Sequence, residues 1–501
     1  MTEINRFTPV VKSLGAVADY LGISIDGKYS EIQITGLSSS SKNIQAGEIF
    51  LALPGVKTHG SAFIQTAVER GARAVITDNS GADSLPLQQL EIPVLVVPNP
   101  RSQIGFLSDW FLNSPSRSMY LAGITGTNGK TTTTFLLNQI WQYAEFSNGL
   151  IGTVGIKVGE DFYPTTHTTP ESDVLHRTLS VMQERHIRNV AMEVSSHALV
   201  QHRVDGVHFS VSGFTNLSQD HLDFHGDMES YYQAKRALFS SSLSEFAVIN
   251  IDHEYGARLA TEITIPNGTL SIHNKKATWH FESLRGDNKG FEVAIRGEGG
   301  VLIEGRINLL GSYNLENCLL AVAIAAHSGV DPLVIGQSLS TLSGAPGRME
   351  KITHGRDFNA LVDFAHSPDA VTKVLKTARE ITNAKLIGIL GCGGDRDKSK
   401  RAIMGKALYE GCDVAIFTSD NPRSEDPMKI LEDMTAGLNL GEHQKVIVDR
   451  AAAIEYAVNI AQPGDTIIVL GKGHETGQEI KGVKTPFSDQ AELRKAIANL
   501  K

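Results

Sequence analysis

A glycine-rich segment at residues 125–131 has the composition of a phosphate-binding loop. It reads TGTNGKT, follows the apolar run MYLAGI and precedes the periodic run FLLNQIWQYA, so we expect a strand before it and a helix after it. In such a loop the glycines let backbone N–H groups face an anion, while Lys130 would reach the outer phosphates and the Thr131 hydroxyl could bind Mg²⁺. The usual spacing has a glycine at the position of Ile124. The GKT triplet in its strand–helix context nevertheless favours a nucleotide phosphate over an ordinary turn.

Two further residues are candidates for a metal site near this loop. Glu193 ends an apolar strand expected at 189–194, where a P-loop enzyme needs a carboxylate to hold Mg²⁺; it could instead pair with a nearby base. His221 follows the next expected strand, 207–214, with carboxylates on either side of it in sequence. Because Mg²⁺ prefers oxygen ligands, the residues alone leave His221 equally explained as a metal ligand or as a hydrogen-bonding group.

Four polar loops follow strands in the last third of the chain. They contain Asp363 and His366, the run GCGGDRDK at 391–398, the run DNPR at 420–423 and the run GKGHE at 471–475. In a doubly wound sheet, ligands bind beyond the carboxyl ends of the strands. A single arginine such as Arg396 or Arg423 is more often an ordinary surface residue, but four such loops at one edge favour a site for an acidic small molecule.

The elements that must position these loops indicate an α/β protein of about three domains. A small unit has strands at 49–53, 73–77 and 93–97 and a helix near 61–70, and ends at the polar connector 113–118. A second unit contains the phosphate loop, a β-hairpin near 290–310 and a helix near 312–328. From Arg348 onward strand and helix alternate, which predicts a doubly wound, mostly parallel sheet. The expected domains are 1–115, 116–346 and 347–501.

Composition excludes several classes of protein. The 501 residues are 41% hydrophobic and 20% charged with 17 prolines, as is typical of a soluble globular protein. A net charge of −9 has the wrong sign for a protein that binds chiefly nucleic-acid phosphates. The three cysteines are too few for a disulfide framework, and neither a signal peptide nor a membrane span is expected. We therefore expect a cytoplasmic protein.

Ten motifs occur in the order in which they occur in the Mur ligases, and the chain resembles that family over nearly its whole length. The motifs are GITGTNGKTTT, HTTPE, MEVSSHALVQHRV, TNLSQDHLDFHGDMESYYQAKRALF, GSYNLENCLLA, PGRME, VDFAHSPDA, GCGGDRDK, DNPR and GKGHE. The resemblance implies a small N-terminal domain that binds the UDP-sugar, a central P-loop ATPase-like domain and a C-terminal Rossmann-like domain that binds an amino acid. It also implies ATP-driven amide formation through an acyl phosphate in peptidoglycan precursor synthesis.

The resemblance extends to particular residues of the ATP and metal sites. Thr131, Glu193 and His221 match Mg²⁺ ligands, Lys130 matches the catalytic lysine, and Lys235 matches a lysine that is carbamylated in the family. From the sequence alone, Lys235 would be a surface lysine of a helix. The residues that match the ATP site are Gly126, Thr127, Asn128, Gly129, Lys130, Thr131, Thr132, Asn314, Asn317, Arg348, Asp363 and His366.

The resemblance also implies the other two substrates, UDP-MurNAc-L-Ala-D-Glu and meso-diaminopimelate. The residues that match the muramoyl-dipeptide part of the UDP-MurNAc-L-Ala-D-Glu site are His167, Thr168, Thr169, Ser195, Gln201 and Arg203. The candidates for its uridine part, in the N-terminal domain, are Ser41, Lys57, Thr58 and His59. Those that match the diaminopimelate pocket are Arg396, Asp420, Asn421, Pro422, Arg423, Gly471 and Glu475. Arg423 can pair with the distal carboxylate of diaminopimelate and would repel the lone distal ammonium of lysine. Many members have Asp-Ser-Arg where this chain has Ser40-Ser41-Lys42, which leaves the uridine pocket open in detail.

Three alternatives are weighed against this interpretation. Folylpolyglutamate synthetase, a relative, lacks the uridine-binding domain and the DNPR loop. A regulatory nucleotide-binding protein would not need Lys130, Glu193, His221, Lys235 and Asp363 together. A nucleic-acid-dependent motor fits neither the net charge nor the loop spacing. We expect a monomer whose domains close for reaction, because the phosphate loop and the amino-acid pocket are on different domains.

Overall fold

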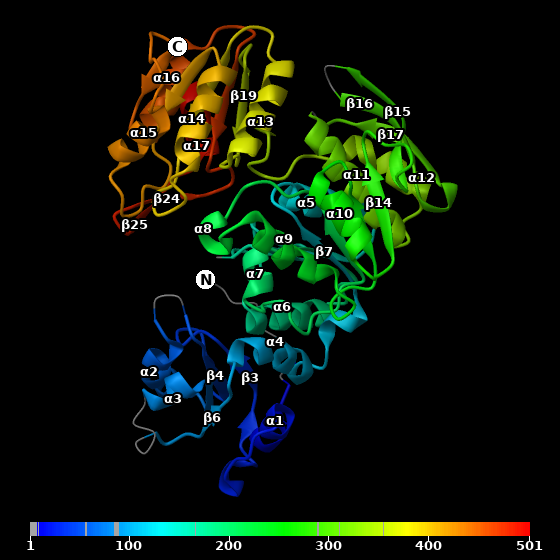
Figure 1. Ribbon diagram of the computed structural model, residues 1–501, viewed down its shortest axis with the longest axis vertical. Coiled ribbons are helices and arrows are strands. Elements are labelled where there is room, and N and C mark those ends of the chain that lie inside the picture. The colour runs from blue at the N-terminus through cyan, green and yellow to red at the C-terminus, as the bar shows by residue number, and fades with distance from the viewer. Residues whose placement is uncertain are drawn as a thin grey trace.

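The computed structural model describes residues 8, 10–55, 58–84, 90–165, 167–287, 290–309, 311–353 and 355–500. Its three main sheets come from successive stretches of the chain and form the three layered units seen in Figure 1. The predicted three-domain α/β fold is confirmed. The boundaries expected after residues 115 and 346 stay predictions.

The first unit is a four-stranded parallel sheet in chain order. It consists of β3 (Gly36–Ser38), β4 (Glu48–Ala52), β5 (Ala74–Thr77) and β6 (Val94–Val96). The strands β1 (Lys12–Ser13) and β2 (Gln33–Ile34) form a separate pair, and the helices are α1 (Leu14–Leu21), α2 (Ile64–Glu69), α3 (Asn79–Asp83) and α4 (Pro100–Phe111). Apolar residues of α1 and α4 cover one face of the sheet, which makes the core of this domain.

The central unit is an eleven-stranded sheet whose middle strands carry the phosphate loop. Strand β7 (Tyr120–Thr125) lies between β11 (Asn189–Glu193) and β12 (Val211–Phe214), all parallel. Their nearly continuous burial reflects helices on both faces, so their apolar runs do not alternate. The carboxyl ends of the three strands therefore meet at one edge, beside the start of α5 (Lys130–Tyr143).

Parallel strands on either side and antiparallel strands at both ends complete the central sheet. The strands are β8 (Asn148–Ile151), β9 (Ile156–Val158), β10 (Asp161–Tyr163), β13 (Ala247–Asn250), β14 (Asn267–Ser271), β15 (Trp279–Asp287), β16 (Gly290–Arg296) and β17 (Leu302–Ile307). The predicted hairpin is confirmed as β16 and β17. Strand β15 was not predicted, because its outer two thirds are exposed and lack the alternation of a half-buried strand.

Short and long helices surround this sheet. They are α6 (Ser172–Glu184), α7 (Ser196–Val200), α8 (Leu222–His225), α9 (Met228–Arg236), α10 (Glu254–Glu262), α11 (Ser312–His327) and α12 (Pro332–Ser338). Helix α11 is buried along nearly its whole length and packs on α5. It thereby brings residues more than 180 positions downstream against the first turn of α5, as in the bond from Thr133 to Asn317.

The C-terminal unit is a six-stranded sheet in the order β18-β19-β23-β20-β21-β22. All its strand pairs except β18–β19 are parallel, so the predicted mostly parallel sheet is confirmed. The strands are β18 (Glu350–Lys351), β19 (Asn359–Asp363), β20 (Leu386–Leu390), β21 (Val414–Phe417), β22 (Gln444–Val446) and β23 (Thr466–Leu470). One face is covered by α13 (Pro368–Glu380), α14 (Lys400–Gly411) and α15 (Pro427–Thr435), and the other by α16 (Arg450–Ile460) and α17 (Asp489–Ala498). A hairpin, β24 (Gly477–Ile480) and β25 (Val483–Pro486), follows β23.

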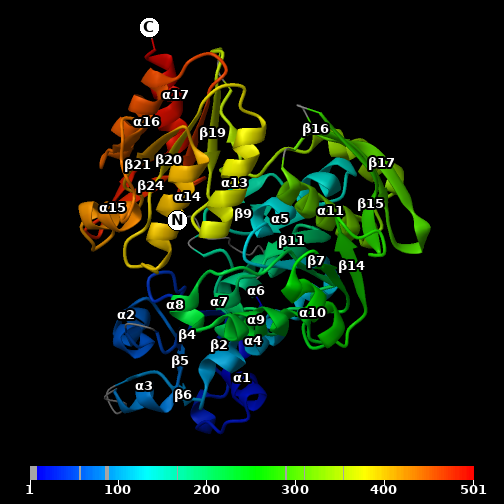
Figure 2. The same ribbon diagram turned by 45° about the horizontal axis from the view of Figure 1, so that its top comes forward.

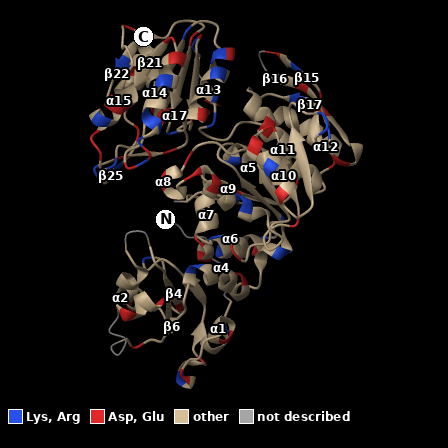
Figure 3. Ribbon diagram, viewed as in Figure 1, with Lys and Arg blue, Asp and Glu red and all other residues tan. Residues whose placement is uncertain are grey.

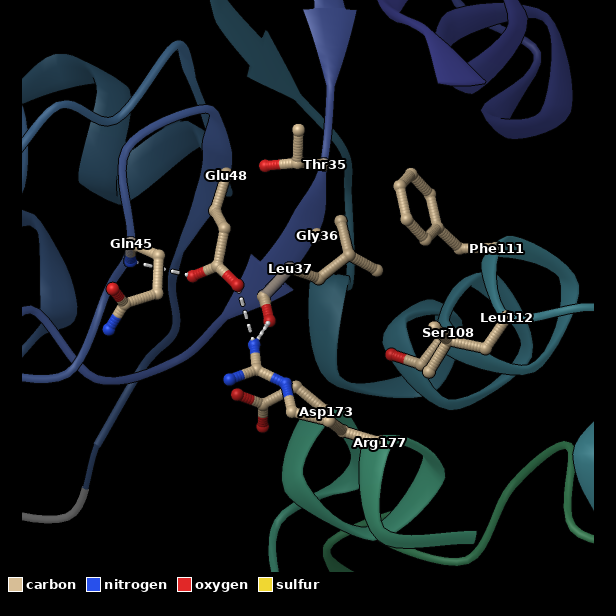
Figure 4. Close-up of a pocket in the computed structure, with 10 residues that line it drawn as sticks. All are labelled: Thr35, Gly36, Leu37, Gln45, Glu48, Ser108, Phe111, Leu112, Asp173 and Arg177. Carbon is tan, nitrogen blue, oxygen red and sulfur yellow. Dashed lines mark hydrogen bonds and ion pairs between the residues drawn. The ribbon is translucent and has the colours of Figure 1, made fainter. Parts of the chain in front are cut away.

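Helix α6 of the central domain holds the N-terminal domain in place. Arg177 donates to the carbonyl of Leu37 and to Glu48 Oε1, both at 2.8 Å, and Figure 4 shows these bonds at the wall of a groove between the two domains. Asp173 accepts bonds from the backbone N–H and the hydroxyl of Ser39, at 2.7 and 2.9 Å. These side chains join the edge strand of one domain to the first turns of a helix in the next.

Helix α8 lies where the central domain meets the C-terminal domain in both Figure 1 and Figure 2. This contact brings the loop after β12 close to the start of α14. Of the helices in the described ranges, none has both the length and the apolar character needed to cross a membrane.

Candidate active site

The phosphate loop binds its own lysine in this structure. Gly126 and Gly129 have φ angles of +145° and +89°, and the loop they form curls around Lys130. The Lys130 ammonium donates to the carbonyls of Gly126 at 2.8 Å and Thr127 at 2.9 Å. A Cβ at Gly129 would lie 2.2 Å from Asn317 Oδ1, so this glycine also allows α11 to approach the loop.

Glu193 lies directly beside the loop. It is 1% exposed, and its carboxylate accepts bonds from the Thr131 hydroxyl at 2.9 Å and from the N–H and hydroxyl of Thr153 at 2.7 and 3.0 Å. Nowhere in the described ranges do three His, Cys, Asp or Glu side chains gather into a metal-binding group. A carboxylate and a hydroxyl in contact nevertheless fit Mg²⁺, which takes one or two protein oxygens when phosphates supply others.

Lys235 is a buried lysine rather than a surface one. It is 1% exposed, and its ammonium donates to the same Gly126 carbonyl as Lys130, at 2.8 Å. Its nitrogen lies 4.6 Å from the ring centroid of Tyr231, whose hydroxyl is 3.2 Å from Thr127 Oγ1. Burial and the nearby positive charge of Lys130 hold the pKa of Lys235 well below its usual range. The amine is therefore far easier to deprotonate than that of an exposed lysine.

His221 lies at a junction of two domains through its neighbour Asp220. Asp220 is 7% exposed; its Oδ2 is 3.7 Å from His221 Nε2 and 3.9 Å from His366 Nε2, and its Oδ1 is 3.6 Å from the ammonium of Lys400. These positive or ionisable neighbours outweigh burial and lower the pKa of Asp220 to about 2. Burial lowers the pKa of His221 to about 3. Its imidazole is thus neutral, the form that can ligate a metal.

Residues of the C-terminal domain approach the phosphate loop from the other side. Arg348 donates to Thr131 Oγ1 at 3.3 Å, and its guanidinium lies 4.4 Å from the ring centroid of Phe364. Asp363 accepts bonds from the backbone N–H groups of Met349 and Ala365, both at 2.7 Å, which fixes the loop that carries Phe364. One pocket is lined by eight of the predicted ATP-site residues: Asn128, Gly129, Thr132, Asn314, Asn317, Arg348, Asp363 and His366.

A second polar cluster joins the loops after β21 and β23. Asn421 donates from its amide to Glu475 Oε2 at 2.8 Å, and the buried ammonium of Lys472 donates to the same oxygen at 3.0 Å. Arg423 has a left-handed backbone, with φ +50°, and its guanidinium donates to the carbonyl of Gly394 at 2.6 Å. Gly471 has φ +110°, and a Cβ there would lie 2.7 Å from Asp420 Oδ2.

A third cluster lies between the central and N-terminal domains. Arg203 donates to the carbonyl of Thr169 at 2.9 Å and pairs with Glu171 at 2.9 Å. Glu171 also pairs with Arg101 of the N-terminal domain at 3.4 Å. The Ser195 hydroxyl caps α7 and its N–H donates to Thr169 Oγ1 at 3.0 Å. This cluster adjoins Glu193, whose backbone carbonyl accepts a bond from Thr169.

Three known domain families match the chain in the same order as its three sheets. Their descriptions are Mur ligase family, catalytic domain, at residues 33–109; Mur ligase middle domain, at 124–325; and Mur ligase, glutamate ligase domain, at 347–473. The UDP-N-acetylmuramoyl-L-alanyl-D-glutamate--2,6-diaminopimelate ligase of Streptomyces coelicolor is 43% identical over 490 residues, which cover 97% of this chain and 96% of that protein. The chain belongs to the Mur ligase family.

Two other Mur ligases extend the likeness. The protein of the same name from Aquifex aeolicus is 41% identical over 467 residues, covering 93% of this chain and 94% of its own. A solved structure of a UDP-N-acetylmuramoyl-L-alanyl-D-glutamate--2,6-diaminopimelate ligase is 31% identical with a TM-score of 0.67, and the match covers 97% of this chain and 99% of that one. Both sequence and fold are therefore shared along nearly the whole Mur ligase chain.

The structure gathers most of the predicted site residues but not all. Ser41, Thr58 and His59 are in the N-terminal domain, where His59 is bonded to Asp78 at 3.1 Å within its own domain. Lys57 lies outside the described residues. Other predicted residues lie at the edges of the three clusters: Thr168 is 3.0 Å from Thr153, His167 and Arg396 are exposed, Gln201 ends α7, and Pro422 lies between Asn421 and Arg423.

Three residues of this Mur ligase site were missed by sequence reasoning. Asp220 was noted only as a neighbour of His221, although it joins two domains. Glu171 was quoted in the HTTPE motif without a role, and Lys472 was quoted in GKGHE in the same way. The sequence contains a signal that could have identified all three: each is a charged residue inside a motif that also contains a predicted ligand-binding residue.

Proposed function

We propose that this Mur ligase joins meso-diaminopimelate to UDP-MurNAc-L-Ala-D-Glu with hydrolysis of ATP to ADP and phosphate. The observation that carries the proposal is the identity above 40%, over nearly the whole chain, to ligases named for that reaction. It is supported by the three clusters, which lie at the phosphate loop, at the seam with the N-terminal domain and in the C-terminal loops. A reaction that uses three substrates requires three such sites.

In the proposed reaction, a carboxylate oxygen of the D-Glu residue attacks the γ-phosphorus of ATP, and the bond to the ADP oxygen breaks. The diaminopimelate amine then attacks the acyl phosphate carbon, loses a proton and displaces inorganic phosphate. Lys130 would leave its two carbonyl partners to neutralise the phosphate oxygens, and Arg348 at Thr131 is placed to add a second positive charge. Holding both acidic substrates in line supplies the remaining catalysis.

We assign Mg²⁺ binding to Glu193 and Thr131, with His221 as a further ligand. A bound Mg²⁺ would supply charge neutralisation on the phosphates. Glu193 is held by Thr131 and Thr153, so its carboxylate is fixed before nucleotide arrives.

The substitution Lys130→Met tests the role of the phosphate-loop lysine. It should abolish substrate-dependent phosphate release while leaving the fold intact, which circular dichroism would check.

Lys235 is the proposed site of carbamylation. A neutral lysine amine attacks the carbon of CO₂, a nitrogen–carbon bond forms and one proton is released. The burial of Lys235 favours the neutral amine that this step needs. NMR of the enzyme in isotope-labelled bicarbonate should show a carbamate signal that disappears in Lys235→Met. A wild-type spectrum without that signal would contradict the assignment.

Arg423 is the proposed determinant of amino-acid choice. Its guanidinium is anchored on Gly394, at the edge of the loop that carries Arg396, and would pair with the distal carboxylate of diaminopimelate. Lysine and ornithine lack that carboxylate. The substitution Arg423→Leu should raise KM for diaminopimelate about tenfold or more. The control Arg379→Leu removes an arginine from a partly exposed pair with Asp413 in the same domain and should leave KM unchanged.

The deciding experiment is phosphate release from ATP in the presence of UDP-MurNAc-L-Ala-D-Glu and, in turn, meso-diaminopimelate, L-lysine or L-ornithine. We expect turnover with diaminopimelate alone. Turnover with lysine would keep the ligase activity but contradict the role of Arg423. Absence of phosphate release with all three amino acids would favour the regulatory alternative. Stimulation of phosphate release by DNA or RNA would favour the nucleic-acid-dependent motor. Figure 3 shows basic and acidic residues interspersed in all three domains, which does not favour nucleic-acid binding.

We further infer that the enzyme acts as a monomer in the cytoplasm. Its substrates are nucleotide-activated precursors, and its three cysteines are buried free thiols, as suits a reducing compartment. Folylpolyglutamate synthesis is disfavoured by the presence of both the N-terminal domain and the DNPR loop.

A further inference from the structure

Lys472 is a fully buried lysine in the middle of the proposed amino-acid pocket. It follows Gly471, its side chain is 0% exposed, and it is not among the residues expected to contact substrate. Its ammonium lies 3.0 Å from Glu475 Oε2 and 3.2 Å from Asn421 Oδ1. Both partners are among the residues assigned to the diaminopimelate pocket.

A buried ammonium is costly unless opposite charge and hydrogen-bond acceptors surround it. Around Lys472 these are the carboxylate of Glu475, the amide oxygen of Asn421 and, at longer range, the buried carboxyl of Asp420. Burial raises the pKa of Asp420, and the positive charge of Lys472 is the largest effect that opposes this rise. Lys472 therefore bridges side chains of two loops, and its positive charge favours the ionised forms of Asp420 and Glu475.

The two oxygens of Glu475 are placed in different surroundings. Oε2 accepts bonds from both Lys472 and the Asn421 amide, at 3.0 and 2.8 Å. Within the part of the chain that the structure describes, Oε1 forms neither a hydrogen bond nor an ion pair with another residue. The Glu475 side chain is 36% exposed, so one oxygen is anchored while the carboxylate remains reachable.

We propose that Lys472 is a positioning residue for amino-acid recognition: it fixes Glu475 and Asn421 so that Glu475 Oε1 is presented to an ammonium group of the incoming amino acid. The inference rests on the proposed function of the pocket. Lys472 itself does not touch the substrate. Its loss would let Glu475 turn, whereas the bond from the Glu479 N–H to Asn421 Oδ1 would still hold the Asn421 loop. The KM for the amino acid should therefore rise while phosphoryl transfer is retained.

The test compares Lys472→Met with wild type in steady-state kinetics for each substrate. Met keeps most of the side-chain length but removes the charge and the donors. We expect KM for diaminopimelate to rise about tenfold or more, as for loss of one partner of a buried charge pair. The KM values for ATP and for UDP-MurNAc-L-Ala-D-Glu should change less than about twofold, which general unfolding would not produce. Lys472→Arg, which keeps the charge, should recover part of the affinity.

A double-mutant cycle shows whether Lys472 acts through Glu475. If it does, Lys472→Met should add little to the effect of Glu475→Gln on KM for diaminopimelate. Fully additive effects, or equal rises in KM for all three substrates, would overturn the inference. If Lys472→Met does not fold, the same cycle with Lys472→Gln decides. Gln also removes the charge, so an unchanged KM for diaminopimelate in that variant would contradict the positioning role. Failure of wild type to use diaminopimelate would instead contradict the proposed function.

Discussion

At the scale of single residues, a buried histidine near the site should make the stability of the protein depend on pH. His474, in the GKGHE loop, has its pKa lowered to about 4, first by burial and then by the positive charge of Arg348. Between pH 6.5 and about 4 the unfolded chain takes up a proton at this residue and the folded chain does not. The free energy of unfolding should therefore fall as the pH is lowered through this window, by about 1 kcal/mol at pH 5 after allowance for solvent screening.

The measurement is urea unfolding at pH 7 and pH 5. His474→Gln should flatten the pH dependence, whereas His443→Gln, at an exposed position of the same domain, should leave it unchanged. An unaltered slope in His474→Gln would show that other groups cause the acid sensitivity.

The sequence predicted the type of many site residues but not their surroundings. The phosphate loop, Glu193 and the DNPR loop follow from local order, because each lies where a strand ends. The burial of Lys235, by contrast, depends on α9 packing behind a loop more than a hundred residues earlier in the chain. Likewise, Asp220 meets Lys400 only through contact of two domains. A contact between distant segments leaves no mark in the local pattern.

At the scale of elements, α14 and α15 brace the amino-acid loops through one arginine. Arg401 is 1% exposed and pairs with Glu425 at 2.8 Å and Asp433 at 2.9 Å. Glu425 also accepts a bond from the backbone N–H of Asp395, so the arginine supports the loops after β20 and β21 together. Arg401→Met should lower the free energy of unfolding of this domain by about 3 kcal/mol and weaken diaminopimelate binding.

Lys406→Met is the matched control on the same helix. Lys406 pairs with Glu410 with both side chains more than 60% exposed, so its loss should cost less than about 0.5 kcal/mol. Denaturant midpoints compare the two variants, and equal losses of stability would contradict the bracing role of Arg401.

Elements were predictable where burial imposes a pattern. The strands of the C-terminal sheet are continuous apolar runs separated by helical periodicity, and the predicted alternation of strand and helix along the chain is confirmed. The strand expected at 207–214 is shorter in the structure, where β12 spans Val211–Phe214, because only an isolated bridge forms at Phe209. The position of β23 between β19 and β20 could not be read from the sequence, since strand order depends on how the chain crosses over.

At the scale of the whole molecule, α6 sets the position of the N-terminal domain. Arg177→Met removes two bonds that cross the seam and should raise KM for UDP-MurNAc-L-Ala-D-Glu about tenfold, with KM for ATP unchanged, since that substrate would span both domains. Small-angle scattering should show a larger radius of gyration. Arg185→Met, which breaks a pair inside the central domain, should change neither quantity. An equal rise in both KM values would contradict a role confined to the seam.

Closure of the C-terminal domain remains a prediction at the same scale. Asp220 with Lys400 and Thr131 with Arg348 already cross between the domains, at 3.6 and 3.3 Å. We expect the radius of gyration to be smaller with ATP and both other substrates bound than without them. Lys400→Met should weaken that compaction. Scattering curves that do not change on addition of all three substrates would exclude closure.

The place of β23 in its sheet has a consequence for how the protein is made. Strand β23 pairs with β19 on one side and β20 on the other, yet it is the last strand of that sheet to be synthesised. Until residue 470 has left the ribosome, β19 and β20 each present an unpaired apolar edge, which is the kind of surface through which nascent chains aggregate. The N-terminal and central sheets can close earlier, because none of their strands comes from beyond residue 307. The proposed amino-acid site is therefore the last part of this ligase to form.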